Sequence, residues 1–277
     1  MTDVSSATRG PAALPSRSRP PARPRFGTLR TLSALILREV GSTYGRSPGG
    51  YVWAILEPVG MIVIMSFVFS YIVRSPSLGT SFPVFFASGF LPYGFYTAIE
   101  NKTTRAIKST SALMAYPRIL WIDVILARFI LTVCTGLLTI AIIFTLILST
   151  SDIRVTIDLV PILIALTIAA LGGLGVGMVN AFLNAVFPLW SLIWGIVTRP
   201  LMIGSAVLYI VEDMPPTLRD ILWWNPLVHV TGLFRKGIYN TYEASYASPI
   251  YCYAVGLTLV ALGLLFLSAW YKKVIEA

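Results

Sequence analysis

Tyr44-Gly45-Arg46-Ser47-Pro48-Gly49-Gly50-Tyr51-Val52-Trp53-Ala54-Ile55-Leu56-Glu57-Pro58 separates a basic part of the chain from an almost entirely apolar part. Pro48 and the glycines after it interrupt a helix, whereas Tyr51 and Trp53 are residue types that favour a membrane–water interface. Glu57 lies about 9 Å along a helix that starts at Tyr51. A carboxylate at that depth is costly in hydrocarbon and normally faces protein or water. The stretch therefore predicts a hinge between a helix lying on a membrane and the first helix crossing it.

The composition predicts an all-α integral membrane protein. Of the 277 residues, 56% are hydrophobic and only 12% are charged, whereas soluble domains carry about 25% charged residues. Residues 1–26 are rich in Arg, Pro and Ser and cannot bury a core, so we expect a disordered cytoplasmic tail. A basic tail before a membrane helix is a topology signal or an anionic-lipid contact rather than a nucleic-acid site.

Residues 27–277 are expected to form one transmembrane domain. Apolar residues spaced three or four apart over residues 28–44 predict an amphipathic helix at the membrane interface. Runs of the length needed to cross a bilayer then predict six spans. These spans cover about residues 51–72, 81–99, 121–148, 159–182, 187–210 and 250–270.

Three of these segments carry unusual residues. Pro83, Gly89, Pro92 and Gly94 make the second span irregular, which favours packing against protein instead of lipid exposure. Glycines at 172, 173, 175 and 177 allow close helix approach in the fourth span. Asn180, Asn184 and Pro188 are expected to mark the break before the fifth span. The apolar centre at 221–234 is too short to cross, so it predicts a re-entrant or interfacial hairpin between the fifth and sixth spans.

The basic residues predict the orientation. With the N-terminus inside and six spans, most of the 21 basic residues fall in inside segments. The outside loops hold only Arg74, Arg154, Arg219, Arg235 and Lys236. Both termini are therefore expected in the cytoplasm.

Enzyme chemistry is not expected in this chain. No Gly-x-x-x-x-Gly-Lys-Ser/Thr loop, Gly-x-Ser-x-Gly elbow or His-Glu-x-x-His motif occurs, so the sequence lacks these routes to nucleotide binding and hydrolysis. The single histidine, His229, excludes a histidine cluster for a metal. An intramembrane enzyme would need a base beside a nucleophile, and no such pair is seen.

Three segments in order resemble a known family of transporters. Leu37-Arg38-Glu39, Tyr44-Gly45-Arg46 and Gly50 to Pro58 resemble the opening of the ABC-2-type polysaccharide export permeases, especially the capsular polysaccharide (KpsM-like) branch. Leu113 to Arg118, followed by Asp123 to Arg128, is similar to a second segment of that branch. Trp224-Asn225-Pro226-Leu227 is similar to a third. The resemblance runs from about residue 30 to the end.

This resemblance implies a function and several partners. Two permeases would pair around a canal and bind a homodimeric ATPase subunit, which would hold ATP and Mg. A lipid-linked acidic polysaccharide would pass from cytoplasm to periplasm across a bacterial inner membrane, toward a periplasmic adaptor of the co-polymerase type and an outer-membrane channel. The alternatives are export of O-antigen or teichoic acid and, in another class, an ATP-independent channel or scaffold.

The resemblance also suggests roles for residues near the cytoplasmic face. The segment with Lys102, Arg105, Lys108, Leu113, Met114 and Tyr116 is similar to the coupling helix that docks on the ATPase; the alternative is an ordinary positive loop. Arg38 and Arg46 are candidates for the phosphorylated or acidic end of a glycolipid, or for lipid headgroups. Tyr51, Trp53 and Glu57 would form a gate, with Glu57 in an intersubunit pair, an interhelix pair or a structural hydrogen bond.

Three further residues are candidates for the canal and the outer hairpin. Arg199 lies mid-way along the fifth span, where it would contact an acidic polymer, form a structural pair or cap a helix end at Pro200. Trp224 and His229 lie in the hairpin, where re-entrant backbone lines a cavity. The aromatic residues around them would stack on sugars or form an interfacial belt.

Overall fold

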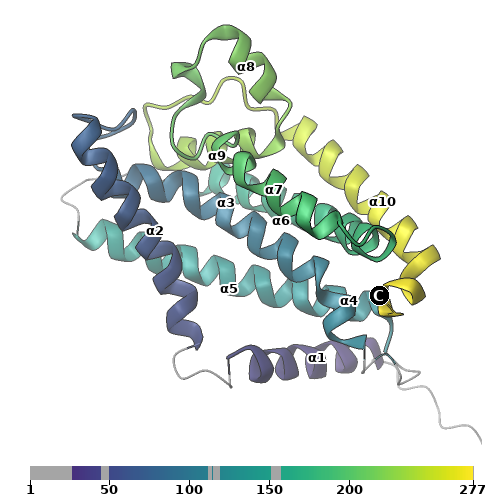
Figure 1. The fold of residues 1–277 in the computed structure, drawn as a ribbon. Coiled ribbons are helices and arrows are strands. Elements are labelled where there is room, and N and C mark those ends of the chain that lie inside the picture. The colour runs from purple at the N-terminus through teal and green to yellow at the C-terminus, as the bar shows by residue number, and fades with distance from the viewer. Residues whose placement is uncertain (1–26, 45–49, 112–113, 115–118, 151–156, 277) are drawn as a thin grey trace, which may run out of the picture.

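A computed structural model describes residues 27–44, 50–111, 114, 119–150 and 157–276, and these residues are mainly helical (Figure 1). The expected tail, residues 1–26, lies outside the described residues. The all-α membrane fold expected from the composition is confirmed. The elements in chain order are α1 (Gly27–Tyr44), α2 (Gly50–Ile72), α3 (Phe82–Thr104), α4 (Ala106–Ser109), α5 (Trp121–Thr150), α6 (Leu159–Val186), α7 (Trp190–Ile203), η2 (Val211–Asp213), α8 (Pro216–Trp223), α9 (Pro226–Ile238) and α10 (Pro249–Glu276).

Five helices among the described residues are long and apolar enough to cross a membrane: α2, α3, α5, α6 and α10. Each begins within one residue of the expected start of a span. Several extend further than expected, and α3 continues to Thr104 instead of residue 99. Polar residues at these ends leave the apolar layer but still form helical hydrogen bonds, so the end of an apolar run does not mark the end of a helix.

The helix at the fifth predicted span is shorter than expected. α7 has 14 residues, about 21 Å of helix against a hydrocarbon core of about 30 Å. The expected helix to residue 210 is therefore wrong beyond Ile203, and a sixth crossing stays a prediction. The side-chain nitrogen of Asn225 donates to the carbonyl of Gly204 (2.9 Å), which draws the chain into the hairpin just after the helix ends.

The centre of the molecule is α3, which packs against α2, α5, α6 and α9 (Figure 1). On its far side from α3, α6 packs along α10. A Cβ atom added at Gly173 would lie 2.8 Å from the carbonyl oxygen of Tyr96 on α3, and one at Gly175 would lie 2.9 Å from the nitrogen of Val260 on α10. The glycines of α6 therefore permit backbone approach on two sides, as expected.

The two ends of the molecule differ. The end of α3, α4, the start of α5 and the end of α10 gather at one end, beside α1 (Figure 1). There, Ile107 and Val274 share one apolar cluster, and Trp121 stacks on Tyr271 at 6.4 Å between ring centroids. The hairpin with α8 lies at the opposite end (Figure 1). The segments expected on the cytoplasmic side therefore meet at one end, which is called the α4 end below.

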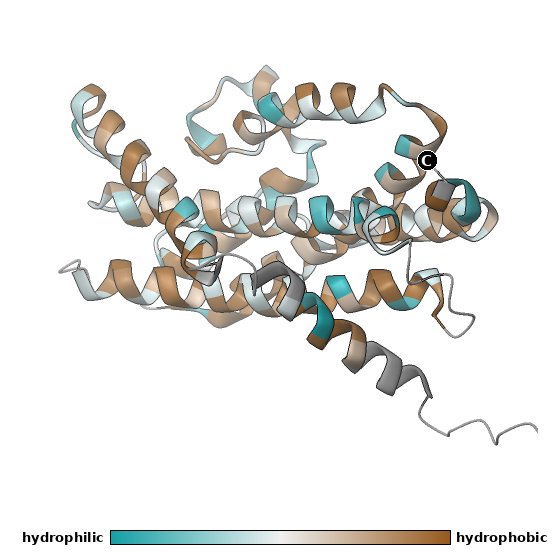
Figure 2. Cartoon of the chain, turned by 60° about the horizontal axis from the view of Figure 1, so that its bottom comes forward, coloured by the Kyte–Doolittle hydropathy of each residue, from teal (hydrophilic) through white to brown (hydrophobic). Residues whose placement is uncertain are grey.

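Apolar residues run along most of the length of the long helices (Figure 2), and many of them are exposed. Phe67 of α2 is 63% exposed, and Leu192 of α7 is 64% exposed. In a membrane protein such faces meet lipid or another protein rather than water.

Candidate functional site

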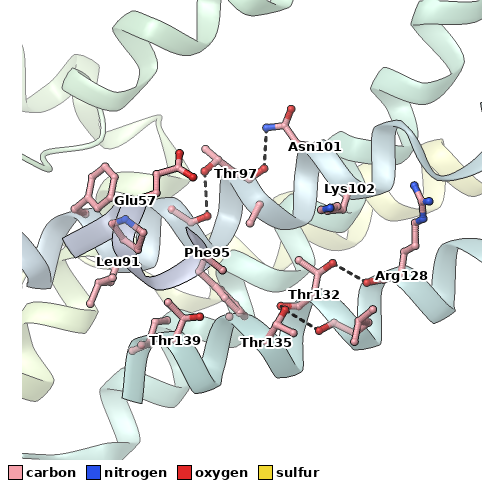
Figure 3. A pocket seen from close by; sticks show the side chains of 18 of the residues that line it. Glu57, Leu91, Phe95, Thr97, Asn101, Lys102, Arg128, Thr132, Thr135 and Thr139 are labelled. Atoms are coloured by element: carbon pink, nitrogen blue, oxygen red, sulfur yellow. Dashed lines mark hydrogen bonds between the residues drawn. The ribbon is translucent and has the colours of Figure 1, made fainter. Parts of the chain in front are cut away.

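A cavity of about 540 Å³ lies between α2, α3 and α5 and reaches Glu39 of α1. Its walls combine ionisable, hydroxyl and apolar side chains (Figure 3). Thr132, Thr135 and Thr139 recur every three or four residues and therefore share one face of α5. Leu91 and Phe95 of α3 lie on the opposite wall. The volume is within the range of about 300–1,000 Å³ typical of ligand pockets.

An ion pair joins α1 to α5 beside this cavity. A terminal nitrogen of Arg128 lies 3.0 Å from a carboxylate oxygen of Glu39, and both side chains are largely buried. The other terminal nitrogen of Arg128 donates to the carbonyl of Arg105 at 3.4 Å. Asp123, which the sequence places near Arg128, instead accepts from the backbone nitrogen of Leu120 at the start of α5. The partner of Arg128 comes from a helix far away in the sequence.

The gate residues expected near the hinge are only partly described. Glu57 lines the cavity from α2 and is exposed; among the described residues it has no hydrogen bond or ion pair. Trp53 is 62% exposed on the same helix, and Arg38 is exposed on α1. Tyr51 lies in the first turn of α2, but Arg46 lies outside the described residues. The structure therefore brings Glu57, but not Trp53 or Arg38, to this cavity.

The expected coupling segment presents basic side chains at the α4 end. Lys102, Arg105 and Lys108 are exposed, while Ala106 and Ile107 are fully buried between them. Met114 packs against the same apolar cluster; Leu113 and Tyr116 lie outside the described residues. Lys102 lies in the last turn of α3 and Lys108 lies in α4, while Arg105 is the single residue between these two helices. Lys102 alone of them also lines the cavity.

A buried polar network near the α4 end was missed by the sequence reasoning. Glu100 of α3 is 2% exposed, and its carboxylate accepts from Asn180 of α6 at 2.8 Å and from Thr104 at 3.0 Å. The indole nitrogen of Trp190 donates to the Asn180 side chain at 2.9 Å. Asn180 and Asn184 both lie inside the continuous α6 and do not mark the break, whereas Pro188 lies in the break, which comes at residues 187–189. The available signal was a carboxylate and an amide within apolar segments.

Arg199 lies in a helix that is open to its surroundings. α7 has no buried residue, and Arg199 is exposed. The hydroxyl of Tyr93 on α3 donates to the carbonyl of the neighbouring Thr198 at 3.2 Å. Within the part of the chain that the structure describes, Arg199 has no ion pair, so the structural pair considered from the sequence is not found there.

His229 is part of the interior of the hairpin, not of a surface that could line a canal. It is fully buried. Its Nδ1 accepts from the backbone nitrogen of Ser248 (3.1 Å), so its Nε2 carries the proton and donates to the carbonyl of Trp223 (2.7 Å). Burial lowers the pKa of His229, which favours this neutral form. The expected canal contact of His229 is therefore corrected to a structural role.

Trp224, in contrast, is 69% exposed. Its carbonyl accepts from the hydroxyl of Tyr251 at 2.8 Å, and the ring of Tyr251 stacks on Trp223 at 4.8 Å. The Asn-Pro step that follows starts α9, because the Asn225 side chain accepts from the nitrogen of Leu227 (3.0 Å) and Pro226 occupies the first turn. The ring of Trp224 is thus exposed, while hydrogen bonds fix the turn that carries it.

Arg235 was expected in an outside loop, but it is buried at 1% exposure. It donates to the carbonyls of Val207 (2.9 Å) and Tyr209 (2.6 Å), and its guanidinium lies 4.6 Å from the ring centre of Phe85. Its charge therefore anchors the hairpin to α3 and does not serve as a solvated topology signal.

The comparisons with known proteins agree over most of the chain. A family described as ABC-2 type transporter matches residues 30–239. The polysialic acid transport protein KpsM of Escherichia coli is 27% identical over 234 residues, which cover 84% of this chain and 91% of KpsM. The capsule polysaccharide export inner-membrane proteins CtrC of Neisseria meningitidis serogroup B and BexB of Haemophilus influenzae are 25% and 26% identical; each match covers 88% of this chain and 92% of the relative.

Proposed function

This chain belongs to the ABC-2 type transporter family, and we propose that it is the permease of an exporter that moves capsule polysaccharide outward across a bacterial inner membrane. The observation that carries the proposal is the similarity, over most of the chain, to the polysialic acid transport protein KpsM and to the capsule polysaccharide export inner-membrane proteins CtrC and BexB. Five apolar helices of spanning length support a permease, and the N- and C-termini would be cytoplasmic.

The permease would act as a pair of copies around a canal. In one chain, large apolar side chains are exposed along most of α2 and α7. The exposed Arg199 is a charged residue within this apolar surface of α7. A charged side chain within a membrane segment normally faces protein or a water-filled path. A canal between two copies would give Arg199 such a path and a contact for an acidic, lipid-linked polymer, with Trp224 at the outer mouth.

The driving force would come from a separate ATPase subunit that binds ATP and Mg. The exposed bases Arg105 and Lys108 flank the buried anchor formed by Ala106 and Ile107. This arrangement suits a docking element, because the basic side chains stay accessible while the apolar ones transmit movement to α5 and α10. Onward transfer would use a periplasmic adaptor and an outer-membrane channel.

The test is a deletion strain of the source bacterium that carries either the wild-type gene or a variant. We expect deletion to retain polysaccharide inside the cell and the wild-type chain to restore it to the surface. Arg105→Glu/Lys108→Glu should abolish restoration and co-purification of the ATPase, whereas Lys272→Glu/Lys273→Glu, exposed at the same end, should retain both. Lys102 is left unchanged because it lines the cavity.

If the deletion leaves the amount of polysaccharide on the cell surface unchanged, the export function is contradicted. Retention of O-antigen or teichoic acid instead of capsule would contradict the proposed substrate. Restoration by the charge-reversed variant at the wild-type level would contradict docking at α4 and leave export itself intact.

A further inference from the structure

The cavity between α2, α3 and α5 changes in character along its length. Lys102 and Arg128 lie toward one end, the α5 threonines follow, and Leu91 lies toward the other end (Figure 3). Along α5, the distance from Arg128 to Ile140 is about 18 Å. Apart from Glu57 of α2, ionisable groups, hydroxyl groups and apolar groups therefore succeed one another in the order found across one leaflet of a bilayer.

The ionisable end carries a small positive balance. Glu39 and Arg128 neutralise each other at 3.0 Å, and Lys102 adds one positive charge from the last turn of α3. The Nε of Arg128 is buried and has no hydrogen-bond partner among the described residues. Glu57 extends from α2 toward the other end, with its exposed carboxylate directed away from the threonine row (Figure 3). One net positive charge matches the single negative charge of a phosphodiester.

The middle of the cavity is lined by the hydroxyl groups of the α5 threonines. The hydroxyls of Thr132 and Thr135 donate to carbonyls of their own helix at 2.7 and 2.9 Å, so this part of the wall is intermediate in polarity between the two ends. The far end is lined by apolar side chains, including Phe90, Leu91 and Ile140. A ligand that fits all three levels is an amphiphile with an anionic head and a hydrocarbon tail.

We propose that this cavity binds one lipid with a phosphodiester headgroup, from the leaflet that contains α1. The phosphate would lie between Lys102 and Arg128, the linker beside Thr132 and Thr135, and one acyl chain against the apolar end. Bound there, the lipid would fill the space between α2 and the helices α3 and α5. It would thereby stabilise α2, which has few contacts with the rest of the chain. The inference requires only that the chain lies in a bilayer and is independent of the polymer exported.

Native mass spectrometry of the full-length protein tests this proposal, because it counts lipids that survive delipidation in detergent. The protein is reloaded with phosphatidylethanolamine, phosphatidylglycerol or a phosphate-free diacyl glycolipid, without polymer. We expect one retained phospholipid per chain and at least tenfold lower occupancy by the phosphate-free lipid. At subsaturating lipid, Lys102→Gln should lower phospholipid occupancy at least tenfold, since a charged hydrogen bond contributes about 1.5–3 kcal/mol. Lys272→Gln, the matched loss of an exposed charge at the same end, should not.

A second pair of variants tests the position of the tail. Thr135→Trp fills the cavity and should abolish retention, whereas Thr145→Trp, at an exposed threonine of α5 with the same type of backbone hydrogen bond, should retain the lipid. If Thr135→Trp does not fold, the Lys102→Gln comparison still decides the result. Equal retention of the phosphate-free lipid, or wild-type occupancy in Lys102→Gln, overturns the proposal.

The same readout identifies the source of the lipid. Protein purified from cells that make the polymer would carry either a bilayer phospholipid or the phosphate-bearing lipid anchor of the polymer, and the two differ in mass. Either one supports the site, and absence of both from cell-derived and reloaded protein overturns it. Because binding is measured without export, failure here leaves the export function untouched, and loss of export leaves this result untouched.

Discussion

The helices α2 and α3 have the same length, 23 residues, but they are used in opposite ways. In the most apolar window of α3, 67% of residues are buried, against 11% in α2, although α2 is the more apolar of the two. In a bilayer, apolar side chains gain little by leaving lipid for protein, so hydrophobicity alone does not direct a helix to the centre. Burial of α3 follows instead from its small and polar residues.

Three features of α3 permit its central place. Gly89 lets the backbone of the hairpin approach, since an added Cβ atom would lie 2.5 Å from the carbonyl oxygen of Val207. Glu100 and Tyr93 bond to α6 and α7. α2 has no comparable contacts among the described residues, and Gly60 on it has open space around its Cα. α3 is thus specified by contacts within the chain, and α2 is left for lipid or another chain.

The sharpest test of this contrast compares two phenylalanines. Phe86 of α3 is 2% exposed and Phe67 of α2 is 63% exposed. Phe86→Ala should lower the free energy of unfolding by about 3 kcal/mol, because it leaves a cavity beside Phe69 and Phe85. Phe67→Ala should change it by less than about 0.5 kcal/mol. Thermal or denaturant unfolding in detergent measures both.

Phe67→Ala should, however, weaken pairing of two copies if α2 lies at their interface, which cross-linking in the membrane would detect. Equal losses of stability in the two variants would break the contrast between the helices.

The next largest effect on stability is expected from a comparison of Gly89 on α3 with Gly60 on α2. Gly89→Val should lower stability by about 1–3 kcal/mol, because the added side chain overlaps backbone atoms of Val207 that cannot move away freely. Gly60→Val is the matched control on α2 and should leave the midpoint of unfolding within experimental error. The amount of folded protein in the membrane fraction provides a second measurement. A stable Gly89→Val protein would show that the hairpin can shift from α3.

The sequence was sufficient for features determined by local pattern. Apolar runs located the starts of the long helices. Glycines in the fourth span correctly predicted close packing. Each of these features depends on residues near one another in the chain and on the thickness of a bilayer.

Features that depend on distant partners could not be predicted in this way. Arg235 resembles any basic loop residue until Val207 and Tyr209 surround it, and His229 looks accessible until Ser248 and Trp223 occupy both ring nitrogens. The cavity likewise arises from three helices whose lining residues show no common motif. Charge in a membrane protein therefore indicates orientation only where the side chain stays solvated.

The smallest predicted effect concerns α7. Like α2, this helix is exposed along most of its length, but the indole of Trp190 bonds its start to Asn180 of α6. Trp190→Phe removes the hydrogen bond to Asn180, worth about 1 kcal/mol, so local opening of α7 should increase about fivefold. Hydrogen–deuterium exchange of peptides from α7 measures this, with Leu192→Ala, at a 64% exposed site on the same helix, as the control that should exchange like the wild type. Unchanged exchange in Trp190→Phe would mean that the second copy or the bilayer holds α7 in place, so that its position is not specified by contacts within the chain. A selective increase would instead place α7 between the two extremes, because a contact within the chain would hold its start, as such contacts hold α3 along its length, while most of its surface stays exposed like that of α2.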